Sequence, residues 1–210
     1  MVNAFDMTVF FGDYPFRGFS QTSLQDLAQR CKTLQISGAA VSSFQQIFHE
    51  NNLDAARRDA KLLESFPQFA HFVVVNPTYP RQLEELQKVL LEMPIAGLRL
   101  LPNYHHYHLW DARVQELFAL AKSYELPVQI HREIQDRRLQ WMLSVLPLDV
   151  EELEWLLSNP PEIKVLLSGL SRTDLLQLQA KILAAPNIWV DTSRLRGPVF
   201  GLENLTELLQ

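Results

Sequence analysis

The sequence repeats one pattern along its length: a short apolar run, a polar loop and then a segment with helical periodicity. The apolar runs predict strands at Ala4–Phe11, 36–41, 70–75, 96–100, Val128–His131, 163–167 and 187–191. Continuous apolar runs that alternate with helices are typical of parallel strands covered by helices. We therefore expect a single α/β domain over residues 1–210, built from about seven parallel strands.

Two architectures accommodate such repeats. A doubly wound sheet usually carries a glycine-rich turn after its first strand, whereas Phe11 is followed by Gly12 and then by Asp13, Tyr14 and Pro15. Polar residues instead follow nearly every strand, which favours a TIM-type (β/α) barrel. A complete barrel has eight strands in ~250 residues. We expect an incomplete barrel, in which 201–210 forms a helix and the eighth unit is missing, through a truncated gene product or a real loss.

The composition limits the class of partner. The net charge of −5 and the pI of about 5.7 give no reason to expect binding to nucleic acid or to an anionic membrane. No stretch approaches the ~18 apolar residues of a membrane span, and no basic leader precedes an apolar run. Cys31, the single cysteine, excludes an internal disulfide. These features predict a cytoplasmic protein.

Titratable side chains gather after two of the predicted strands, 96–100 and Val128–His131. Four of the six histidines and one asparagine lie at these two ends: Asn103, His105, His106, His108 and His131. The carboxyl ends of barrel strands carry the active-site groups in this architecture. Such a cluster can bind a metal ion, but imidazole and aromatic rings in a loop of this kind more commonly pack over a barrel mouth and hydrogen-bond to the backbone.

Three charged residues, Asp6, Arg99 and Asp191, lie within or at the end of predicted strands. Arg99 interrupts an apolar run, where an unpaired charge is costly. We expect it either to pair with Asp6 or Asp191, or to hold an anionic ligand with its planar guanidinium group. Asp191 ends the seventh strand, where a carboxylate can act as a general base, cap the loop at Thr192 and Ser193, or pair with Arg194.

Several short motifs together resemble a known family. They are residues 5–12 with 14–17, then 75–77, 97–105 and 190–193. In this order they resemble the amidohydrolase-related ("amidohydrolase 2") family, whose members are metal-dependent TIM-barrel hydrolases and include the aminocarboxymuconate-semialdehyde decarboxylase type. The resemblance covers essentially the whole chain.

The resemblance also implies a set of metal ligands, most of which this sequence lacks. The His-x-His of strand one falls on Thr8 and Phe10, and the histidine of strand six falls near Ser168. The histidine of strand five matches His131, and the aspartate of strand eight would lie beyond Gln210. Because a catalytic zinc needs about three protein ligands, we expect no metal cofactor.

Two functions remain open. The first is a hydrolase or decarboxylase for a small carboxylated, anionic molecule. Its catalytic groups would be His131, Asp191 and His105, and its substrate-binding groups would be Arg99, Asn103, His108 and Asp6. The second is a non-catalytic protein that keeps the barrel and binds a small ligand or a partner. An incomplete barrel has free strand edges, so we also expect a homodimer.

Overall fold

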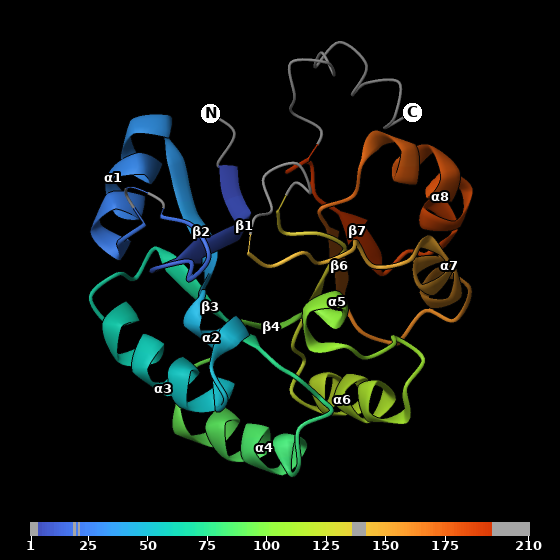
Figure 1. Ribbon diagram of the computed structural model, residues 1–210, viewed down its shortest axis with the longest axis horizontal. Helices are drawn as coiled ribbons and strands as arrows, with labels where there is room; N and C mark the ends of the chain where they lie inside the picture. The colour runs from blue at the N-terminus through green and yellow to red at the C-terminus, as the bar shows by residue number, and fades with distance from the viewer. Residues whose placement is uncertain (1–3, 19, 21, 136–141, 195–210) are drawn as a thin grey trace.

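The computed structural model describes residues 4–18, 20, 22–135 and 142–194 (Figure 1). Seven parallel strands form one sheet in simple sequence order, from β1 to β7. Their bounds are β1 Ala4–Phe11, β2 Ile36–Ser43, β3 Phe69–Val74, β4 Gly97–Leu100, β5 Val128–His131, β6 Val165–Ser168 and β7 Ile188–Val190. Strands that follow one another without a reversal belong to a barrel-type fold, so the doubly wound alternative is excluded.

Helices follow the strands; the longer ones cover the outside of the curled sheet, and the short helices α2 and α5 lie inside this outer ring (Figure 1). Their bounds are α1 Leu24–Leu34, α2 Gln45–Phe48, α3 Asn52–Leu63, α4 Gln82–Glu92, α5 Pro102–His105, α6 Ala112–Ser123, α7 Val150–Ser158 and α8 Arg172–Ala184. Ser171 and Asp174 form a reciprocal capping box that fixes the start of α8. No helix in the described part of the chain is both long and apolar enough to cross a membrane.

The sheet remains open. Within the described ranges β1 pairs only with β2, and β7 pairs only with β6. The result is an open half-barrel that resembles TIM barrels, which confirms the predicted α/β barrel class. The helix expected at 201–210 lies outside the described residues.

Side chains alternate between the two faces of the strands, as pleated backbone requires. Leu98 and Leu100 point outward into the main apolar core beneath the helices, and both are fully buried. Arg99, between them, points into the barrel together with Gln129, its partner in register on β5. The barrel interior therefore holds buried polar groups, and the apolar core lies mainly between the strands and the helices.

Candidate functional site

Arg99 lies at the centre of the barrel, with no exposed surface. Its Nε donates to Gln129 Oε1 (2.6 Å), Nη1 to Val9 O (2.7 Å) and Ser42 Oγ (3.0 Å), and Nη2 to Met7 O (2.9 Å) and Ala40 O (2.7 Å). A guanidinium group has five N–H donors, and the protein accepts from all of them. Burial lowers the pKa of Arg99 to about 9, and the group stays charged at pH 7.

The acceptors around Arg99 are neutral, which differs from the expected ion pair. Asp6 and Asp191 act on Arg99 only through longer-range attraction, without a direct contact in the described structure. Strand β1 supplies its carbonyls because its register shifts between Asp6 and Val9, and such an irregularity re-aims backbone groups. Gln129 extends the network, donating to Met7 O (2.9 Å) and Ser168 Oγ (2.7 Å). We call Arg99, Gln129, Ser42 and Ser168 the interior network.

Phe10 and His131 lie beside this network. The Phe10 ring centroid is 4.7 Å from the Arg99 guanidinium carbon and 5.4 Å from the centroid of the His131 ring. His131 is only 1% exposed, and neither ring nitrogen has a hydrogen-bond partner among the described residues. Burial, reinforced by the Arg99 charge, lowers the pKa of His131 to about 3. The imidazole is therefore neutral at physiological pH.

Thr8 and Asp191 meet across the open side of the barrel. Thr8 Oγ1 donates to Asp191 Oδ2 (2.6 Å), while the backbone N–H and the hydroxyl of Ser193 donate to Asp191 Oδ1 (3.1 and 2.7 Å). Burial alone would raise the pKa of Asp191. Hydrogen bonds from Ser168, Thr8 and Ser193 outweigh it and hold the pKa below its usual range. Asp191 is an ionised carboxylate whose oxygens are both engaged.

The histidines that follow β4 point in different directions. His105 Nε2 donates to Ile47 O (3.0 Å), and burial lowers the pKa of His105. His108 Nδ1 contacts Glu152 Oε1 (3.0 Å), and this hydrogen bond raises the pKa of His108. His106 is exposed. The three side chains do not converge on His131 in the described structure, and only His105 combines burial with a hydrogen bond to a backbone carbonyl.

Asn103 and Asp6 also serve local structure. Asn103 Nδ2 donates to Arg132 O (3.2 Å) and Leu146 O (3.0 Å), joining α5 to the long segment after β5. Asp6 is exposed on β1 and accepts from the backbone N–H of Thr8 (3.0 Å). The roles predicted for the seven site residues stay predictions. Of these residues, Arg99, His131 and Asp191 face one interior, and the others do not.

Sequence reasoning missed the aromatic side chains that cover the mouth of the barrel. Phe10, Tyr14, Phe16, Phe44, Phe48 and Tyr104 contact one another with ring centroids 5.2 to 5.9 Å apart. They come from β1, β2 and β4 and the segments that follow these strands. Five of the six lie in two short stretches, 10–16 and 44–48, and this local enrichment was the available signal.

The donor set does not fit the metal of the metal-dependent hydrolases. Of the four family positions that fall within the described ranges, only His131 carries a good ligand; Thr8, Phe10 and Ser168 do not. No group of three or more His, Cys, Asp or Glu side chains that could hold a metal ion occurs in the part of the chain that the structure describes. The buried Arg99 cation would also repel a metal ion beside Phe10.

The fold and its strand order define an open half-barrel of the TIM-type α/β class. The sequence model of the amidohydrolase family (amidohydrolase 2) matches residues 11–208, and the chain belongs to that family. No functionally curated protein matches the sequence.

Solved structures support the fold. A structure described as amidohydrolase II is 13% identical, with a TM-score of 0.67, over 98% of this chain and 82% of its own. An uncharacterised TIM-barrel protein from Bordetella bronchiseptica is 15% identical with a TM-score of 0.58, over 80% of this chain and 59% of its own. A dihydroorotase from Campylobacter jejuni is 12% identical with a TM-score of 0.54, over 90% of this chain and 52% of its own. The matched region thus spans just over half of the Bordetella and Campylobacter proteins.

Proposed function

We propose that this amidohydrolase-family protein has exchanged the metal centre for a packed barrel interior, and that it binds a small ligand or a partner without hydrolysing it. The observation that carries the proposal is the environment of Arg99. A fully buried cation with five protein acceptors lies 4.7 Å from the ring of Phe10, where the family pattern has a histidine ligand. Such an interior favours stability of the barrel over metal chemistry.

A ligand of the expected anionic kind would have to find donors other than Arg99. Each N–H of Arg99 already has an acceptor, and separating a buried charge from its partners is costly. The interior network is therefore not the proposed binding site for an anion.

The free strand edges of β1 and β7 in the described structure support a homodimer. Light scattering tests this proposal, and a monomer at high concentration would contradict it.

Metal-independent hydrolysis or decarboxylation of a small carboxylated molecule is the second candidate. His131 favours it, because both of its ring nitrogens lack a partner among the described residues. In that reaction His131, Asp191 and His105 would exchange protons with the substrate. A general base must reach the proton that it removes, and a histidine that is 1% exposed reaches a substrate only if side chains that bury it, such as Phe10, move.

Metal analysis and an activity panel test the proposal. Protein purified without added metal is expected to contain far less than one zinc per chain and to leave amide, lactone and ester substrates intact. One zinc per chain, lost in His131→Ala but kept in the exposed control His49→Ala, would overturn it. Turnover by the metal-free protein that disappears in both His131→Ala and Asp191→Asn would establish the second candidate instead.

A further inference from the structure

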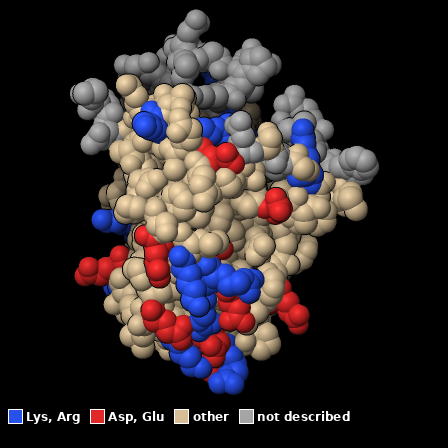
Figure 2. Space-filling model, turned by 90° about the vertical axis from the view of Figure 1, so that its left-hand side faces the viewer, with Lys and Arg blue, Asp and Glu red and all other residues tan. Residues whose placement is uncertain are grey.

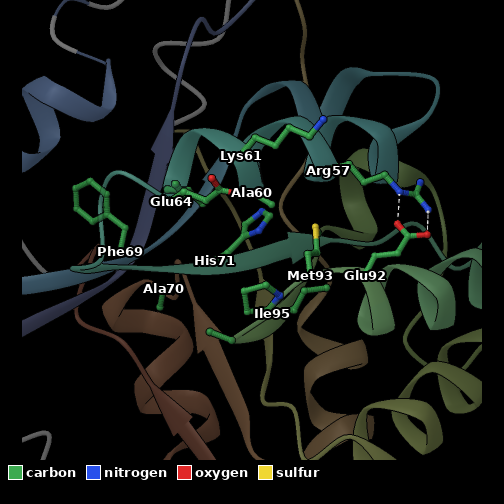
Figure 3. Close-up of a pocket in the computed structure, with 13 residues that line it drawn as sticks. Arg57, Ala60, Lys61, Glu64, Phe69, Ala70, His71, Glu92, Met93 and Ile95 are labelled. Carbon is green, nitrogen blue, oxygen red and sulfur yellow. Dashed lines mark hydrogen bonds and ion pairs between the residues drawn. The ribbon is translucent and has the colours of Figure 1, made fainter.

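A cavity of about 590 Å³ lies between α3 and the segment that joins α4 to β4 (Figure 3). Its position is beside the first half of β3, away from the strand tips where the family's active sites lie. Ala60, Phe69, Met93 and Ile95 give it apolar walls. Its volume is within the ~300–1,000 Å³ of small-molecule sites.

His71 projects from β3 into this region, towards α3 (Figure 3). It is 6% exposed, and its hydrogen bonds identify the nitrogen that carries the proton. The backbone N–H of Val74 donates to Gln46 Oε1 (2.8 Å), so the NH₂ group of Gln46 faces the other way. That NH₂ group donates to Asp59 Oδ2 (2.6 Å) and lies 3.2 Å from His71 Nε2. His71 Nε2 therefore accepts, and the proton is on Nδ1.

The Nδ1–H of His71 is a buried donor without a partner among the described residues. Native proteins pair nearly all such groups, because an unmade buried hydrogen bond is destabilising. Burial lowers the pKa of His71 to about 4, so the ring stays neutral at pH 7. An oxygen acceptor from a ligand would complete the hydrogen bonding of this residue.

The charges at the rim leave one cation available. Arg57 is bound to Glu92 (2.7 Å) and Asp54 (3.0 Å). Lys61 has no ion-pair or hydrogen-bond partner within the described ranges, and it lines the cavity together with Glu64. The face that carries α1 and α3 mixes positive and negative side chains at the height of α3 (Figure 2). Such a mixed surface suits a small ligand better than a polyanion.

We propose that this cavity binds a small molecule with an apolar body and a terminal carbonyl or carboxylate oxygen. The oxygen accepts the hydrogen bond from His71 Nδ1, and the apolar body lies against Phe69, Met93 and Ile95. Methionine adapts readily to a bound molecule, so Met93 can move to admit the ligand. The site is separate from the interior network and does not depend on whether the chain is catalytic.

Ring-nitrogen NMR of ¹⁵N-labelled protein tests the tautomer and the ligand class together. His71 is expected to be the Nδ1–H tautomer in the free protein. Octanoate and 2-octanone each offer an oxygen acceptor and are expected to shift the His71 Nδ1 signal, whereas octylamine, a donor-only cation at pH 7, is not. Equal binding of all three probes, or an unchanged Nδ1 signal with each, would overturn the proposal.

Variants then locate the site. His71→Phe removes the donor and is expected to weaken octanoate binding about tenfold, the usual effect of one lost hydrogen bond. Ala60→Trp fills the cavity while keeping His71, and should abolish binding even if His71→Phe fails to fold. The control Leu91→Trp changes an exposed side chain of α4 and should bind as the wild type does. Full binding by Ala60→Trp would exclude this cavity as the site.

Lys61→Ala distinguishes a carboxylate ligand from a neutral carbonyl ligand. A weaker affinity for octanoate with an unchanged affinity for 2-octanone would identify a carboxylate as the preferred group. Equal affinities of this variant and the wild type for both probes would contradict a role for Lys61 in binding a carboxylate at this site.

Discussion

Thr8 Oγ1 donates a hydrogen bond of 2.6 Å to Asp191 Oδ2, and this contact joins the first strand of the barrel to the end of the seventh. The two strands share no backbone ladder in the described structure. A side-chain contact thus bridges the open side of the half-barrel. Thr8 occupies a position where the family resemblance expects a metal ligand, and here it holds a carboxylate instead.

Asp191→Asn is expected to destabilise the protein by about 1–3 kcal/mol at pH 7, because it removes the charge that accepts from Thr8 and Ser193. The folded state lowers the pKa of Asp191, so its contribution is present above the unfolded pKa of about 4 and is lost as the pH falls through the folded value. Urea denaturation should show the two proteins converging below pH about 4. The exposed control Asp13→Asn should change little, and a gap that widens in acid would contradict this account.

Arg99→Met leaves its protein acceptors unpaired inside the barrel. We expect a loss of about 3–5 kcal/mol in the free energy of unfolding, the usual effect of removing one member of a buried charged network. Arg99→Lys keeps the charge but not the planar fork, and should recover only part of the loss. Arg81→Lys, at an exposed position, is the control; an Arg99→Met variant as stable as the wild type would contradict the interior network.

Chemical modification tests whether Phe10 shields the buried His131 from reagents in solution. Diethyl pyrocarbonate should modify the exposed His49, His106 and His108 quickly and His131 slowly, because His131 is 1% exposed. Phe10→Ala removes the ring that packs against His131 and should raise its rate of modification at least several-fold, as peptide mass spectrometry can measure. Rapid modification of His131 in the folded wild type would show that Phe10 does not cover it.

His108 provides a test of surface electrostatics. Its contact with Glu152 raises the pKa of His108 above the ordinary value of about 6.5. Glu152→Gln removes the negative charge, so an NMR titration should show the pKa of His108 falling towards that ordinary value. The contact favours the charged imidazole, and any stability that it adds disappears as the pH rises through the folded pKa. An unchanged titration would mean that His108 does not pair with Glu152 in solution.

Most of the fold could be read from the sequence, because parallel strands buried on both faces leave continuous apolar runs. The expected and observed bounds agree within two residues for all seven strands. The environment of Arg99 was only partly foreseen: its need for partners was clear, but their neutral identity was not. Carbonyl acceptors such as Met7 O become available through the register shift in β1. No local sequence pattern predicts this shift.

The candidate site was harder to predict from the sequence than the fold. His105, His108 and His131 are close in the predicted topology, yet their side chains face α2, α7 and the barrel interior. Sequence spacing places a residue on a loop but does not fix its rotamer. Gln129 within the apolar strand β5 was the overlooked signal, since a buried amide has to be hydrogen-bonded. The cavity beside His71 depends on how far α3 lies from the segment that joins α4 to β4, and no sequence motif predicts that distance.

The interior network also has a kinetic consequence. Arg99 binds Met7 and Val9, some ninety residues earlier, and Gln129, thirty residues later. Contacts between such distant segments form only after long loops have closed. We therefore expect Arg99 to leave water late in folding, and the same contacts to break early in unfolding. The folded protein would then unfold slowly. Its unfolding rate would be set by how often the hydrogen bonds of Arg99 break.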